Sequence, residues 1–197
     1  MLIFWDRRLV FLATPKAGST AVEVALESLA EVAVQRPPEM KHVNAEGFQR
    51  FVRPWLAALT GDRFTTIALM REPVDWVRSW YRFRLRDDQE DPAHPMAGVD
   101  FDRFARSYID DPLRATDGFG TQSAFLGPAG GVDRLFRYED MEKFTHFLDE
   151  RLDCDINLPR VNVPPAADVS LRPETEAALR DALAEDLALY ASLDRSG

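Results

Sequence analysis

The segment Thr14–Thr20, with the sequence TPKAGST, carries the clearest chemical potential in this chain. It follows the apolar run Leu9–Ala13 and precedes residues whose apolar positions recur at helical spacing. Successive backbone N–H groups at a helix start, together with the helix dipole, form a site for an anion. Gly18 allows the backbone to approach the anion closely, and Lys16 adds a flexible positive charge. The predicted anion-binding residues are Lys16, Ala17, Gly18, Ser19 and Thr20.

This loop differs from the phosphate-binding loop of ordinary ATP and GTP enzymes. In that motif a lysine follows the second of two glycines directly, and a hydroxyl residue follows the lysine. Here Lys16 lies two residues before Gly18, and no glycine lies nearby upstream. An ordinary ATP or GTP site is therefore disfavoured. The remaining alternative to an anion site is a plain strand-to-helix turn with a solvent-exposed lysine.

A second candidate begins at Arg71, at the end of the apolar stretch Phe64–Met70. Ligands of open α/β sheets bind at the carboxyl ends of the strands, and the planar guanidinium of arginine suits a phosphate. Ser79 lies about two turns into the helix that Pro73 begins, where its hydroxyl can donate to the same anion. The alternative is a surface helix whose arginines face water and whose aromatic residues pack in the core.

The two segments together predict a ligand with two separated anionic groups, provided that the two strands are neighbours. The chain resembles the sulfotransferases that use 3'-phosphoadenosine-5'-phosphosulfate (PAPS). The loop of Lys16–Thr20 resembles that family's 5'-phosphosulfate loop, and Arg71, Pro73, Ser79 and Tyr81 match its Arg-x-Pro-x5-Ser-x-Tyr element. Gln122–Leu126 and Arg137–Asp140 also resemble a later family stretch. The resemblance implies that Arg71 and Ser79 hold the 3'-phosphate, with PAPS as donor and no metal.

The resemblance also implies an in-line transfer of the sulfuryl group, catalysed by positioning and electrostatics. Lys16 is expected to stabilise the charge that develops on the leaving phosphate oxygen. A hydroxyl acceptor needs a base, for which His42 is the first choice because an imidazole is suited to proton abstraction near neutral pH. Glu46 is the alternative base, and a surface histidine on an irregular loop is the alternative reading of His42.

Composition narrows the class of protein further. A formal net charge of −9 is unfavourable for a general nucleic-acid binder, which must neutralise phosphates. Cys154 is the only cysteine, so no internal disulfide can form, which favours a reducing, cytoplasmic location. No apolar run approaches the roughly 20 residues of a membrane span. At its start the chain has two short apolar runs separated by charged residues, unlike a signal peptide.

The pattern of elements predicts one α/β domain over residues 1–197, with a mostly parallel sheet, helices on both faces and a P-loop-like architecture. Residues 32–43 are expected to be irregular. The expected strands are 2–5, 9–13, 64–70 and 132–138. The expected helices are 20–30, 44–59, 73–86, 101–108, 140–152 and 173–193, with a short one near Gln122.

Three functions outside the sulfotransferases stay open at this level. One is a non-catalytic module that binds 3'-phosphoadenosine nucleotides, and another is an ATP-dependent, kinase-like P-loop enzyme. The third is an α/β interaction domain that binds no nucleotide. For a sulfotransferase the acceptor is a small molecule or a carbohydrate-like compound, and neither its identity nor the oligomeric state follows from the sequence.

Overall fold

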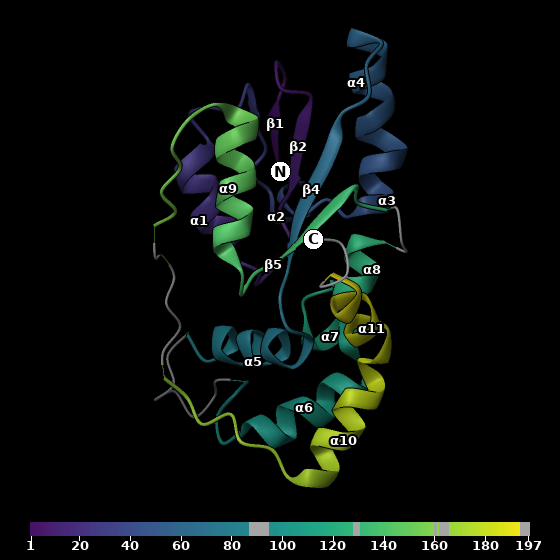
Figure 1. Ribbon diagram of the computed structural model, residues 1–197. Helices are drawn as coiled ribbons and strands as arrows, with labels where there is room; N and C mark the ends of the chain where they lie inside the picture. Colours follow the sequence, from purple (N-terminus) through teal and green to yellow (C-terminus); the bar gives the residue numbers. More distant parts are fainter. Residues whose placement is uncertain (87–94, 128–130, 160, 162–165, 194–197) are drawn as a thin grey trace.

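The computed structural model describes residues 1–86, 95–127, 131–159, 161 and 166–193. Its centre is a five-stranded mixed sheet in the order β3-β1-β2-β4-β5 (Figure 1). Strands β2, β4 and β5 are parallel, whereas β1 is antiparallel to both β2 and β3. The strands are β1 (Leu2–Phe4), β2 (Leu9–Leu12), β3 (Val32–Ala33), β4 (Thr65–Met70) and β5 (Arg134–Arg137).

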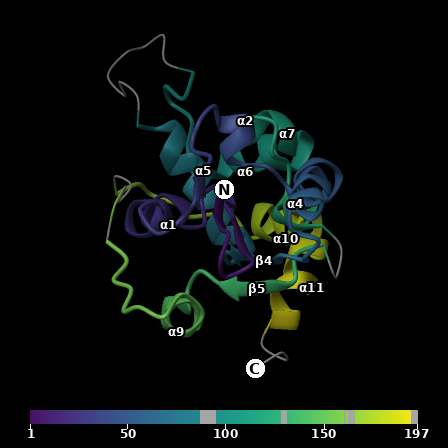
Figure 2. The same ribbon diagram turned by 90° about the horizontal axis from the view of Figure 1, so that it is seen from above.

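Helices cover both faces of the sheet, because strand side chains alternate between two hydrophobic clusters. Leu9 and Phe11 face one cluster, which α1 (Ser19–Leu26) and α9 (Met141–Leu152) complete. Val10 and Leu12 face the other, which receives residues from α3 (Ala45–Gly47), α4 (Arg53–Thr60) and α8 (Gln122–Leu126). Seen from above, α1 and α9 lie on one side of the strands and α4 on the other (Figure 2). The α/β class with helices on both faces is confirmed.

A third hydrophobic cluster lies beyond the carboxyl ends of the parallel strands. It joins α5 (Pro73–Arg84), α6 (Phe101–Asp110), α7 (Pro112–Ala115) and α10 (Pro173–Ala182). Trp76 and Trp80, four residues apart on α5, are 1% and 2% exposed and belong to this cluster. This helical layer faces the sheet edge at which β2 and β4 end, so it forms the opposite wall of any site at that edge.

The prediction that residues 32–43 are irregular is wrong in part. The stretch contains β3 at its start and α2 (Pro38–Lys41) near its end. Strand β3 has only two residues and pairs with β1 at the edge of the sheet. A two-residue strand leaves no alternating pattern in the sequence, and its pairing depends on a partner about thirty residues away.

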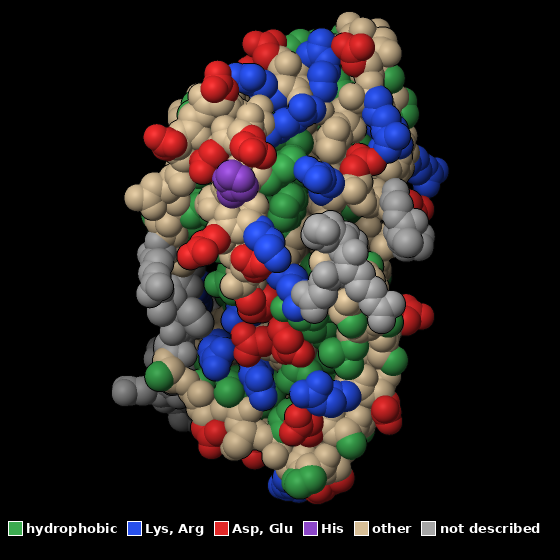
Figure 3. Space-filling model, viewed as in Figure 1, with side chains coloured by type: hydrophobic (Ala, Val, Ile, Leu, Met, Phe, Trp, Pro, Cys, Tyr) green, Lys and Arg blue, Asp and Glu red, His purple; other side chains and the backbone are tan. Residues whose placement is uncertain are grey.

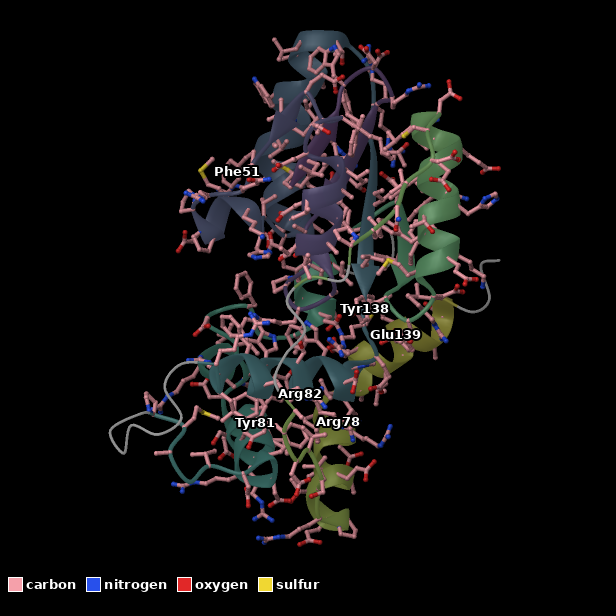
Figure 4. The ribbon with its side chains drawn as sticks, turned by 90° about the vertical axis from the view of Figure 1, so that its left-hand side faces the viewer. Phe51, Arg78, Tyr81, Arg82, Tyr138 and Glu139 are labelled. Carbon is pink, nitrogen blue, oxygen red and sulfur yellow. The ribbon has the colours of Figure 1, made fainter. Side chains whose placement is uncertain are left out.

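The predicted helix 44–59 is interrupted by a π-helical turn, Phe48–Val52, between α3 and α4. A π turn closes with i→i+5 hydrogen bonds and holds more residues than an α turn. The buried face that starts at Phe48 therefore continues at Leu56. Three large apolar residues of the predicted helix are exposed: Phe51, Trp55 and Leu59. Figure 4 shows Phe51 at the periphery of the molecule.

The expected single helix 173–193 is two helices, α10 and α11 (Ala184–Ser192), with the break at Leu183. Leu179 and Leu183 pack in the cluster beneath the sheet, whereas Leu189 and Tyr190 pack against the cluster on the sheet's face. One straight helix cannot place its apolar side chains against both clusters, so the chain changes direction. Residues 87–94, between α5 and α6, lie outside the described residues. Within the described part of the chain, no helix is long and apolar enough to cross a membrane.

Candidate functional site

A cleft of about 1670 Å³ lies where the parallel strands end. Its walls come from the loop after β2, the residue after β4, the residues after β5, and α5 with the segments around it. Figure 4 shows Tyr138 and Glu139 at the end of the sheet that faces α5. Six of the predicted donor-binding residues line the cleft: Lys16, Gly18, Ser19, Thr20, Arg71 and Ser79. The predicted base His42 lines it as well.

Gly18 lies at the start of α1 in the left-handed region, with φ of 78°. A Cβ atom added at this position would lie 2.8 Å from Cε2 of Tyr138. The loop therefore needs glycine for its conformation and for the close approach of the tyrosine ring. In the first turn of α1 the Ala21 N–H donates to the Gly18 carbonyl at 3.0 Å, whereas the N–H groups of Ser19 and Thr20, which precede it, have no acceptor within the helix. Ala17 does not line the cleft, and its buried side chain leaves only backbone atoms for a ligand.

The ammonium group of Lys16 lies on aromatic rings of α5. Its Nζ atom is 3.0 Å from the ring centroid of Phe83 and 4.8 Å from that of Trp80. Burial, followed by the positive charge of Arg86, lowers the pKa of Lys16 to about 7. Lys16 also has a positive φ of 59°, which costs a non-glycine residue free energy. The Lys16 ammonium group is thus held by ring faces, in a backbone conformation that costs free energy. It is therefore favourably placed to move to an anion that enters the cleft.

The guanidinium group of Arg71 is held on three sides. Nη2 and Nε donate to Oδ2 of Asp75 at 2.7 and 3.2 Å, and Nη1 donates to the Lys16 carbonyl oxygen at 3.4 Å. The guanidinium carbon lies 4.8 Å from the centroid of the Tyr138 ring. Burial alone would raise the pKa of Asp75, but the hydrogen bonds and charge of Arg71 hold it below its usual value. Arg71 thus connects the two segments that the sequence singled out separately.

One ring nitrogen of His42 is hydrogen-bonded to the protein backbone. Nδ1 lies 2.5 Å from the carbonyl oxygen of Ala13, and because a carbonyl only accepts, Nδ1 carries the proton. Nε2 of the neutral ring therefore has a free lone pair. Burial lowers the pKa of His42 to about 4, so the ring is neutral at physiological pH but is a weaker base than the near-neutral imidazole expected from the sequence. The imidazole packs edge-on against Phe119 at 5.4 Å. Glu46, the alternative base, is exposed on α3 and does not line the cleft.

The half of the cleft around His42 has a mixed apolar and charged lining. Phe119 stacks on Trp80 with centroids 5.9 Å apart, which extends the aromatic wall beneath Lys16. Lys41 lines the same half and pairs with the buried carboxylate of Glu23 at 2.6 Å. On the face that Figure 3 shows, acidic and basic side chains are interspersed rather than gathered into one field.

Three residues at the site, Tyr138, Asp75 and Gln122, were not predicted from the sequence as functional residues. Tyr138 contacts Gly18 and Arg71, and Gln122 bonds to the backbone of Arg71. The only signal for two of them was the weaker resemblance of Gln122–Leu126 and Arg137–Asp140 to a later family stretch. Among the described residues, no cluster of histidine, cysteine or acidic side chains could hold a metal ion.

The chain was compared with family models, curated proteins and solved structures. No match was found in any of the three comparisons. The cleft and the residues that line it are therefore the grounds for the function proposed below.

Proposed function

We propose that this protein is a PAPS-dependent sulfotransferase with a P-loop-like donor site. The observation that carries the proposal is the contact between the two anion-binding segments, where Arg71 donates to the Lys16 carbonyl within one cleft. The Gly18 loop supplies backbone N–H groups for the 5'-phosphosulfate. Arg71 and Ser79 supply donors for the 3'-phosphate on the α5 side of the same cleft.

The size of the cleft favours a two-substrate enzyme over a module that binds a nucleotide alone. Pockets for one small ligand usually have volumes of about 300–1000 Å³, whereas this cleft has about 1670 Å³. Donor and acceptor can therefore occupy it together. Lys16, Ser19, Arg71 and His42 line the same cleft, so a donor and an acceptor bound there together would both be close to the Lys16 side chain.

In the proposed reaction, Nε2 of His42 takes the proton from a hydroxyl group of the acceptor. The hydroxyl oxygen forms a bond to sulfur, and the bond from sulfur to the 5'-phosphate oxygen breaks with its electron pair. The products are a sulfate ester and 3'-phosphoadenosine-5'-phosphate. Lys16 leaves the Phe83 ring and stabilises the charge on the leaving oxygen. The acceptor is a hydroxyl-bearing small molecule or a carbohydrate-like compound, for which the aromatic wall offers an apolar surface.

A thermal-shift titration tests the donor site directly, because stabilisation by a ligand grows with its concentration relative to Kd. The ligands are 3'-phosphoadenosine-5'-phosphate, AMP, and ATP with and without Mg²⁺. We expect the bisphosphate to give the largest shift without metal, and Arg71→Ala to remove its advantage over AMP. Arg103→Ala, an exposed arginine of α6, is the matched control. A preference for ATP with Mg²⁺, or no shift with any nucleotide, would reject the proposal.

A further inference from the structure

The side chain of Gln122 pairs with the backbone of Arg71 through both ends of its amide. Oε1 accepts from the Arg71 N–H at 2.9 Å, and Nε2 donates to the Arg71 carbonyl at 2.8 Å. Arg71 directly follows the last residue of β4, where the strand pairing ends. The amide therefore continues the hydrogen-bonding ladder for one more residue. Gln122 is fully buried and does not line the cleft.

Gln122 is itself held by a buried carboxylate from the far end of the chain. Oδ2 of Asp186 accepts from the Gln122 N–H at 3.1 Å, and Oδ1 accepts from the Ser123 N–H at 2.8 Å. Asp186 is 1% exposed and lies in the first turn of α11. The break at Leu183, which the sequence did not predict, brings this carboxylate to the start of α8. These bonds connect the C-terminal helix to Arg71 through Gln122.

We propose that Gln122 is the positioning residue of the 3'-phosphate site, and that Asp186 fixes Gln122 in place. The inference rests on the proposed function, since it assigns these residues to that same site. The direction of an arginine side chain depends on the backbone from which it starts. With the Arg71 backbone held on both its N–H and its carbonyl, the guanidinium keeps its place between Asp75 and the Lys16 carbonyl. Gln122 thus acts on the phosphate through Arg71, without touching it.

The test uses Gln122→Glu, which keeps the shape of the side chain and replaces only the donating NH2 group with an oxygen. An ionised glutamate still accepts from the Arg71 N–H but opposes the Arg71 carbonyl with a second acceptor. Because burial raises the pKa of a carboxyl group, we expect the ratio of affinities for 3'-phosphoadenosine-5'-phosphate over AMP to fall roughly tenfold or more at about pH 9, where the glutamate is ionised. AMP has no 3'-phosphate, so its affinity should change little. Calorimetric titrations of the full chain with both nucleotides measure the ratio.

The pH dependence of this ratio separates positioning from general damage to the fold. A protonated glutamate can donate to the Arg71 carbonyl, so the ratio in Gln122→Glu should recover as the pH is lowered from about 9 and the buried carboxyl group takes up its proton. The wild-type ratio is measured over the same range as the reference. Gln49→Glu is the matched control, because Gln49 also donates to a backbone carbonyl, that of Gly131, at 3.2 Å and away from the cleft. Asp186→Asn, which keeps one acceptor, should lower the ratio in the same direction by a smaller factor.

The outcomes distinguish this inference from the proposed function. If the wild type does not prefer the bisphosphate to AMP, both are rejected. If the wild type has the preference and Gln122→Glu keeps it at every pH, the positioning role is rejected and the donor site stands. An equal loss of both nucleotides in Gln122→Glu would show a structural role only, and it would also overturn the inference. If Asp186→Asn leaves the ratio of the two affinities unchanged, Asp186 has no part in positioning Arg71.

Discussion

Nη1 of Arg71 donates a hydrogen bond to the backbone carbonyl of Lys16, 3.4 Å away. The two residues are 55 positions apart in the chain, and each follows a strand of the same parallel pair. Trp76 strengthens the connection, since its Nε1 donates to the Pro15 carbonyl at 2.7 Å. A displacement of the Lys16 loop would therefore also displace Arg71 and α5.

Gly18→Ala should weaken nucleotide binding and destabilise the fold. The left-handed backbone costs an alanine about 1–2 kcal/mol, and the new Cβ would lie 2.8 Å from the Tyr138 ring. Moving that ring also disturbs Arg71, on which it packs. Urea denaturation and nucleotide titration measure the two effects.

Gly61→Ala is the matched control for the backbone strain. Its φ is 74°, close to that of Gly18, but no atom lies within 4 Å of the added Cβ. We expect Gly61→Ala to lose stability by the strain alone and to bind nucleotide normally. Equal losses of stability in the two variants would show that the contact with Tyr138 is unimportant.

Lys16→Ala should reduce sulfuryl transfer about 10²-fold or more, the scale of losing one preorganised donor. Folding should not suffer, because the charged amine is partly buried and its burial is unfavourable. The measurement is turnover of labelled PAPS with a panel of hydroxyl acceptors. Lys143→Ala, which removes an exposed lysine paired with Asp140, is the control. Unimpaired turnover in Lys16→Ala would remove this residue from the mechanism.

Nucleotide binding should take up a proton near pH 8. In the free protein the pKa of Lys16 is about 7, so the amine is mostly neutral there. A bound polyanion favours the charged form and raises this pKa, so a proton enters from the buffer. Below about pH 6 the amine is charged in both states and the uptake should vanish. Calorimetry in two buffers of different ionisation enthalpy measures it. In Lys16→Arg, whose side chain stays charged, the same uptake would contradict this assignment.

His42 should make the protein less stable as the pH falls. Burial lowers its pKa from 6.5 to about 4, so between these values the unfolded chain binds the proton and the native protein does not. The free energy of unfolding therefore falls as the pH drops through that window. Compared with the wild type, His42→Gln should lose less stability between about pH 7 and pH 4.5. His146→Gln, at an exposed histidine of α9, is the control for the loss of an imidazole. Identical slopes in all three proteins would contradict the prediction.

Because of the π turn between α3 and α4, we expect truncation of two phenylalanines three residues apart to change stability by very different amounts. Phe48 is fully buried, and truncating a buried phenylalanine costs about 3–5 kcal/mol. Phe51 is 66% exposed, and substitutions at such positions usually stay within about 0.5 kcal/mol. Phe48→Ala should therefore destabilise the protein strongly and Phe51→Ala hardly at all, as measured by urea denaturation. Similar losses of stability in both variants would contradict the π turn and favour the continuous α-helix that the sequence predicted.

Local sequence patterns predicted most elements of the fold and part of the site. The apolar runs 9–13 and 64–70 became neighbouring parallel strands, and the residues after them came together in one cleft. Such patterns depend on sterics and hydrogen bonds between residues a few positions apart, and these local interactions do not require any tertiary contact. The types of residue at Lys16–Thr20 and Arg71 therefore indicated an anion site before any contact was known.

Only the tertiary structure decided which partners these residues have. The amide of Gln122, 51 positions from Arg71, meets its backbone because α8 packs beside the end of β4. Lys16 lies on Phe83 because α5 crosses beneath its loop. The same holds for the break at Leu183, where packing against two separate clusters overrides a continuous helical pattern. These relationships depend on side chains far apart in the sequence, and no local periodicity records which of them will meet.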